Sequence, residues 1–101
     1  MGNQFYVMPA KVWEHSVWVN EVDGVKLVKD LSQLLQAAGF NILNYVGHEF
    51  KPQGCTALWL LSESHLALHT FPEQGKSYIQ LSSCMLPHFQ KFITFLNEKY
   101  K

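Results

Sequence analysis

Apolar residues recur along this chain with two different periods, and each change of period marks the boundary of a predicted element. Residues 11–19 are rich in Val and Trp, which is typical of a β-strand. Residues 22–40 then change to helical spacing, with apolar side chains at Leu27, Leu31, Leu34, Leu35 and Ala38. Gly39 stands where a residue in the left-handed conformation would end this helix.

The second half of the chain is predicted to form strands separated by short turns, and then a helix. The predicted strands are residues 40–50, 56–62, 65–71 and 77–83. The run 56–62 is mostly apolar, so we expect it to be buried. "KPQG" and "PEQG" are typical of turns. Pro87 suits the start of a closing helix, whose apolar face comprises Phe89, Phe92, Ile93, Leu96 and Tyr100.

The predicted order of elements is a strand, a helix, four strands and a second helix. Short turns join the four later strands, so we expect antiparallel neighbours, and two helices can cover only one face of a sheet. We therefore predict an α+β fold: a two-layer sandwich with a mainly antiparallel sheet and two helices on one face. One domain would span residues 1–101. The other face must meet solvent or a second subunit, which favours a homodimer.

The composition argues against several classes of function. Eight basic residues balance eight acidic ones, without the concentrated positive charge of a nucleic-acid-binding surface. The longest strongly apolar run, "TALWLL", is far shorter than the roughly 20 residues of a membrane-spanning helix. The first residues do not have the pattern of a signal peptide, and Cys55 and Cys84 lack metal-ligand spacing. We expect a cytoplasmic protein that binds neither nucleic acid nor membrane.

Reactive side chains gather in "ESH" and at His69. Taken singly, Ser64 is better explained as a turn residue, and His69 as a hydrogen-bonded, buried imidazole. Along one strand His65 and His69 lie about 13 Å apart, which is too far for joint metal ligation, so no metal site is expected. A serine hydrolase is also disfavoured, because no G-x-S-x-G turn is present. His69 could reach Ser64 only if the chain bent back.

Taken together, these residues closely resemble a known family. "SESHLALHTFPEQG" followed by "SYIQLSSC" is similar to the core of the prokaryotic S-adenosylmethionine decarboxylases, which are pyruvoyl-dependent enzymes. The similarity is strongest from Phe50 to Cys84 and weaker, as a layout of strand, helix and strand, over residues 12–49. It implies a decarboxylase that acts on S-adenosylmethionine and supplies the aminopropyl donor for polyamine synthesis.

The resemblance implies that the chain cuts itself between Glu63 and Ser64. The Ser64 hydroxyl would add to the Glu63 carbonyl and form an ester, and elimination and hydrolysis would leave a pyruvoyl group. His69 would help to remove the Ser64 α-proton as a general base, and Thr56 would hold the attacked carbonyl by a hydrogen bond. The pyruvoyl group derived from Ser64 would supply a ketone that condenses with the substrate amine.

The same resemblance implies roles for three further residues. Cys84 would protonate the substrate after the loss of carbon dioxide, since an unperturbed thiol titrates near 8.5 and can donate at pH 7. Phe50 would lie against the adenine, and Glu73 matches an acidic residue near the site. On the residues alone, Phe50 is as well explained by packing and Glu73 by a turn.

Four positions depart from the family pattern: Thr56 replaces a serine, Phe71 a tryptophan, Gln80 an acidic residue and Met85 a glycine. The last change removes backbone freedom beside Cys84. These differences leave two alternatives open. One is a pyruvoyl-dependent decarboxylase of an amino acid such as arginine or ornithine, and the other is an uncleaved, non-catalytic binding or regulatory relative.

Overall fold

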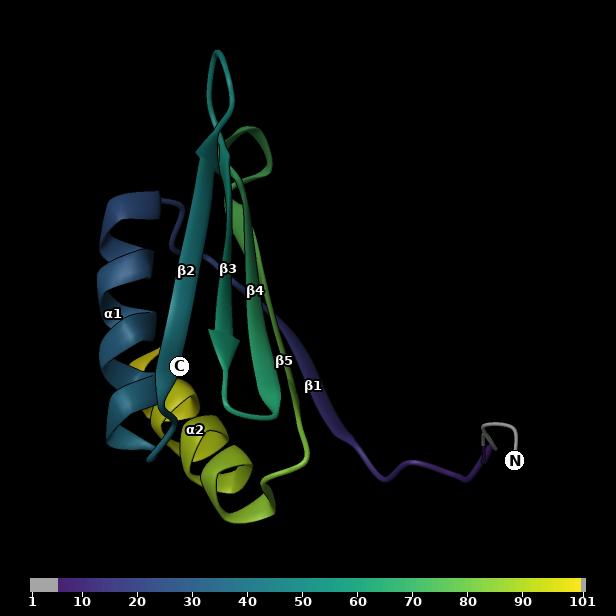
Figure 1. The fold of residues 1–101 in the computed structure, drawn as a ribbon. Helices are drawn as coiled ribbons and strands as arrows, with labels where there is room; N and C mark the ends of the chain where they lie inside the picture. Colours follow the sequence, from purple (N-terminus) through teal and green to yellow (C-terminus); the bar gives the residue numbers. More distant parts are fainter. Residues whose placement is uncertain (1–5, 101) are drawn as a thin grey trace.

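Two helices pack against one face of a five-stranded antiparallel sheet in the computed structural model, which describes residues 6–100 (Figure 1). The elements are β1 (Trp13–Val19), α1 (Gly24–Ala37), β2 (Ile42–Glu49), β3 (Cys55–Leu61), β4 (Ser64–Phe71), the 3-10 turn η1 (Pro72–Gln74), β5 (Lys76–Ser83) and α2 (Leu86–Lys99). The α+β sandwich and the order of its elements agree with the prediction.

The strands are ordered β1-β5-β4-β3-β2, and every neighbouring pair is antiparallel. Short turns join β2 to β3, β3 to β4 and β4 to β5. Strand β1 pairs with β5, so β1 and β2 form the two opposite edges of the sheet. Within residues 6–100, neither helix has the length and apolar character that a transmembrane span requires.

Helix α1 ends before Gly39, as its sequence predicts, and begins after Asp23. The Asp23 side chain accepts a hydrogen bond of 3.2 Å from the backbone N–H of Lys26, which caps the first turn. Gly39 follows the last turn with φ of 98°, a left-handed value that a residue with a Cβ rarely adopts. Between these ends, Leu27, Leu31 and Leu35 are fully buried against the sheet.

Strand β3 shows how the sheet divides into a covered and an uncovered face. Ala57, Trp59 and Leu61 are buried beneath the helices, whereas Leu58 and Leu60 are 44% and 54% exposed. The prediction that residues 56–62 are buried throughout was therefore wrong for one face, because no helix covers it (Figure 1). We call this side of the sheet the outer face.

A buried carboxylate ties the two helices together. Asp30 on α1 receives hydrogen bonds of 2.8 Å from Lys26 Nζ and from the Tyr100 hydroxyl just after α2, and Lys99 Nζ lies 3.8 Å away. The Lys26 hydrogen bond, followed by that from Tyr100, holds the pKa of Asp30 below its ordinary value. Burial, and then the Asp30 carboxylate, raise the pKa of Tyr100 well above its usual range.

Candidate active site

The turn between β3 and β4 contains a strained residue. Glu63 has φ of 59°, and it is the one non-glycine residue with positive φ among residues 6–100. For a residue with a Cβ, the left-handed conformation costs about 1 kcal/mol. The peptide bond from Glu63 to Ser64 therefore lies next to stored backbone strain, which is often found at functional sites.

Ser64 begins β4 with its side chain directed toward another hydroxyl. It is directly opposite Ser83 in the ladder between β4 and β5. The Ser64 Oγ donates a hydrogen bond of 2.7 Å to the Ser83 Oγ, and these two residues are only 8% and 1% exposed. Sequence analysis did not single out Ser83, because its position opposite Ser64 depends on the register of two strands.

Thr56 and His69 form a second pair, opposite each other on β3 and β4. The Thr56 Oγ1 lies 2.9 Å from the His69 Nδ1, in hydrogen-bonding geometry. When Nδ1–H donates to Thr56, Nε2 is left unprotonated and can accept a proton, while the Thr56 hydroxyl can donate elsewhere. The pair thus provides a base and a hydrogen-bond donor side by side.

These two pairs lie at opposite ends of the β3–β4 hairpin. Ser64 pairs with Leu61 near the turn, and His69 lies five residues further along β4, about 16 Å away for an extended strand. Their side chains also lie on opposite faces, because residues an odd number apart on a strand alternate. Within one chain, the structure does not bring Thr56 or His69 to Ser64.

The other residues singled out from the sequence also divide between the two ends. Cys84 follows Ser83 as an exposed free thiol, so it lies at the Ser64 end. Phe50, which is half exposed, follows β2 and lies at the His69 end, where its ring contacts that of His48 with centroids 4.7 Å apart. Glu73 is exposed in η1, directly after β4 and so at the same end as His69.

The His69 end of the outer face carries a row of side chains that crosses all five strands. Register places in it, from β1 to β2, Trp18, Tyr78, His69, Thr56 and His48. Ring centroids are 5.4 Å apart between Trp18 and Tyr78, and 6.2 Å between Tyr78 and His69. Sequence analysis missed the aromatic members and His48, because this row exists only once the strands pair.

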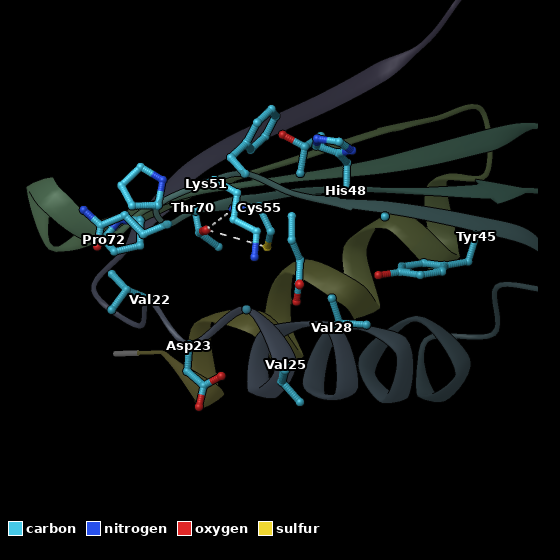
Figure 2. A pocket seen from close by; sticks show the side chains of 18 residues that line it. Val22, Asp23, Val25, Val28, Tyr45, His48, Lys51, Cys55, Thr70 and Pro72 are labelled. Atoms are coloured by element: carbon cyan, nitrogen blue, oxygen red, sulfur yellow. Dashed lines mark hydrogen bonds between the residues drawn. The ribbon is translucent and has the colours of Figure 1, made fainter.

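An open cleft of about 600 Å³ lies between the start of α1 and the β2–β3 end of the sheet (Figure 2). Phe50 and Thr56 contribute to its lining, together with Tyr45, Cys55 and Thr70. The Thr70 Oγ1 accepts the Cys55 backbone N–H at 2.8 Å and donates to its sulfur at 3.6 Å. Partial burial, and then the nearby Cys55, raise the pKa of the Tyr45 hydroxyl.

Sequence comparison decides the family. A family model for S-adenosylmethionine decarboxylase matches residues 10–101. The chain belongs to the S-adenosylmethionine decarboxylase family. This confirms the resemblance in "SESHLALHTFPEQG".

Individual relatives match only part of their own length. The chain is 49% identical over 47 residues to the S-adenosylmethionine decarboxylase proenzyme of Prochlorococcus marinus strain MIT 9313, covering 46% of this chain and 38% of the relative. It is 40% identical over 62 residues to the proenzyme of that name from Brevibacillus brevis, covering 61% and 47%. The chain thus spans less than half the length of these two curated relatives.

The fold is also shared with a solved structure. The crystal structure of the adenosylmethionine decarboxylase from Aquifex aeolicus superposes with a TM-score of 0.62 at 24% identity, covering 87% of this chain and 83% of that one. This likeness shows the same α+β sandwich.

Positions that depart from the S-adenosylmethionine decarboxylase pattern are accommodated without visible strain. Met85 has φ of −106°, which needs no glycine, and its backbone N–H donates to the Ser83 Oγ at 2.9 Å. Gln80 donates a hydrogen bond to Glu14 on the neighbouring strand. Phe71 packs against Trp18 with ring centroids 5.8 Å apart.

Proposed function

We propose that this chain is a self-processing, pyruvoyl-dependent decarboxylase that acts on S-adenosylmethionine. The observation that carries the proposal is the combination of a strained Glu63 and a buried, hydrogen-bonded Ser64 hydroxyl across one peptide bond. Two facts about the family support it: the chain matches over residues 10–101, and the relatives are named proenzymes. The same relatives favour S-adenosylmethionine over arginine or ornithine, and a cleaved chain over an uncleaved one.

Self-cleavage would use atoms of the chain alone, with one water. The Ser64 Oγ attacks the Glu63 carbonyl carbon, the C–N bond breaks, and the hydroxyl proton ends on the Ser64 nitrogen. Loss of the Ser64 α-proton then breaks the Cβ–Oγ bond and releases the Glu63 carboxylate. The dehydroalanine takes up water and loses ammonia. The new terminus is the first residue of β4, which β3 and β5 hold on both sides.

The residues at the Ser64 end fit such a terminus. When formed, the pyruvoyl group supplies an electrophilic ketone that takes the substrate amine and accepts the electrons left behind by carbon dioxide. The Cys84 thiol, which is free and exposed beside Ser83, would deliver the proton. Substrate groups remote from the reaction would be held at the His69 end, with Phe50 against the adenine and Glu73 as an acidic residue near the site.

A second copy of the chain would complete each site. Thr56 and His69 lie on the outer face, one strand length from Ser64 of their own chain, so a two-fold pairing of outer faces can bring them to the backbone of Glu63 and Ser64 in a partner. The outer face offers the surface for it, because Trp18, Val46, Leu58 and Leu60 expose between 44% and 62% of their area there. We propose a homodimer with two shared sites, each formed by the Ser64 end of one protomer and the His69 end of the other.

Denaturing mass spectrometry of the purified protein tests the proposal. We expect two fragments, residues 1–63 and residues 64–101, the second blocked by a pyruvoyl group, in place of the intact 11.6 kDa chain. Release of labelled carbon dioxide from S-adenosylmethionine, but not from arginine or ornithine, would establish the substrate. An intact chain after prolonged incubation would favour a non-catalytic relative.

Mixing two inactive variants tests the shared site separately. Co-expressed Ser64→Ala and His69→Ala chains, each with its own tag, should form mixed dimers in which the His69→Ala chain is cut, because its partner supplies the imidazole. If no His69→Ala chain is cut although mixed dimers form, His69 does not act across the interface.

A further inference from the structure

Ser83 lies against the hydroxyl that self-cleavage would use. Its Oγ accepts the Ser64 hydroxyl at 2.7 Å, and both side chains face the helices at the Ser64 end of the sheet. Both residues are buried, so bulk water has little access to replace Ser83 as the acceptor. The register of β4 and β5 sets this contact, which is independent of Thr56 and His69.

The Ser83 oxygen is itself held in place by the backbone. The N–H of Met85 donates to it at 2.9 Å, so the oxygen accepts two hydrogen bonds and its lone pairs are occupied. The turn that leads into α2 therefore fixes the acceptor against which the Ser64 hydroxyl is oriented. The tight contact fits the requirement that a nucleophile be held in one rotamer before attack.

The direction of this hydrogen bond matters for the chemistry. A hydroxyl has one proton and two lone pairs, and here the proton of Ser64 is directed at Ser83. The lone pairs of the Ser64 Oγ are then free to approach the carbonyl carbon of Glu63, whose left-handed backbone adds strain that the attack can release. Without the Ser83 hydroxyl, the buried Ser64 hydroxyl would rotate to donate to another acceptor, such as a nearby carbonyl.

We propose that Ser83 is a further catalytic residue of self-cleavage, which orients the Ser64 hydroxyl and accepts its hydrogen bond during the N-to-O acyl shift. This inference rests on the proposed function. The shift forms the Oγ–C bond, breaks the C–N bond and moves one proton from the Ser64 Oγ to the Ser64 nitrogen. A proton that travels through Ser83 passes from the Ser64 Oγ to Ser83 while Ser83 gives its own proton to the Ser64 nitrogen, so Ser83 ends the step as a neutral hydroxyl.

Matched serine variants test the proposal by time courses of chain cleavage. Ser83→Ala should slow cleavage roughly 100-fold, as is typical for loss of a group that handles a proton in a reaction. Ser83→Thr, which keeps the hydroxyl, should cleave nearly as fast as the parent. Ser77→Ala is the control, because Ser77 is a buried serine on the same strand and face and donates a bond of 2.7 Å to the Glu21 carbonyl.

Two further measurements separate a catalytic role from a structural one. Hydroxylamine cuts the ester that the acyl shift forms. Uncut Ser83→Ala chains should therefore resist hydroxylamine if Ser83 acts in the acyl shift. Accumulation of a hydroxylamine-sensitive ester would show that the variant is blocked at the later elimination step, and would overturn the proposal. Should Ser83→Ala not fold, Ser83→Val and Ser83→Thr differ mainly by one hydroxyl, and equal cleavage rates for these two would overturn it. A parent chain that never cleaves removes the proposed function as well, whereas equal rates for parent and Ser83→Ala remove the role of Ser83 alone.

Discussion

The two ends of β4 differ in nearly every physical respect. At the first end, Ser64 is buried, follows a strained residue and is held by another hydroxyl. At the second, His69 is partly exposed on the outer face, beside Thr56 and an aromatic row. One end holds the bond that we propose is cut, and the other holds ionisable and aromatic groups.

The difference shows how a short chain could carry out demanding chemistry. The buried end restricts the Ser64 hydroxyl to one geometry, while the open end leaves an imidazole and a large aromatic surface available to other groups. Neither end contains all of the proposed processing residues, because one strand length separates His69 from Ser64. Pairing of two chains would bring the two ends together in one site. Substitutions at each end in turn therefore test the comparison.

The largest effect is expected at the Ser64 end. Ser64→Ala removes the attacking oxygen, so cleavage should be abolished and mass spectrometry should show one intact species. Ser62→Ala, in the same turn but exposed, should be cut as the parent is. Cleavage of the Ser64→Ala chain between residues 63 and 64 would contradict the mechanism.

The two cysteines provide the next test, since Cys84 lies at the Ser64 end and Cys55 beside the cleft at the other. Cys84→Ala should lower decarboxylation per processed chain by about 1,000-fold, because it removes the proposed proton donor. Cys55→Ala should leave turnover close to that of the parent. Equal turnover of the two variants, normalised to the amount of cut chain, would exclude Cys84 as the acid.

A smaller effect is expected at the His69 end. Thr56→Val keeps the shape of the side chain but loses the hydroxyl 2.9 Å from His69, so cleavage should slow about 100-fold. Thr56→Ser should restore most of the rate. Time courses of fragment formation measure both, and if valine and serine behave alike, the hydroxyl has no part in processing.

The smallest effect on cleavage is expected from a change away from both ends. Asp30→Asn weakens the bonds from Lys26 and Tyr100, and should lower the free energy of unfolding by about 2 kcal/mol without altering the cleavage rate. The pKa of Asp30 is lowered in the folded protein, so its contribution is present above the ordinary pKa and lost as the pH falls below about 4.

Denaturant unfolding at several pH values measures this contribution. The difference between parent and Asp30→Asn should be largest at neutral pH and shrink toward pH 3. A difference that stays constant over this range would mean that the Asp30 charge does not stabilise the fold.

Sequence periodicity was sufficient for the elements but not for the exposure of the sheet. Leu27, Leu31 and Leu35 have helical spacing because one side of α1 is buried, so the pattern records the burial directly. In β3, apolar residues occupy both faces, and Leu58 and Leu60 are exposed although their sequence suggests burial. A hydrophobic pattern cannot distinguish a sheet face that a helix covers from one that no other element of the chain covers.

The candidate site was predictable as a set of residues but not as an arrangement. The motif indicated Ser64, His69 and Cys84, yet placing them at two ends requires the antiparallel register of β3, β4 and β5. Ser83 could not be identified from local sequence, since its contact with Ser64 joins residues that are 19 apart. Interactions of this kind depend on strand pairing, which a single sequence specifies only weakly.

The strand order also determines what would happen to the protein once it has been cut. The piece ending at residue 63 contains β1 and β3, while the other contains β4 and β5, and these lie between them in the sheet. The two products would therefore be interleaved, and separating them would require two ladders of backbone hydrogen bonds to break at once. Scission would change the covalent chain while leaving a single folded body, which migrates as one particle until a denaturant is added.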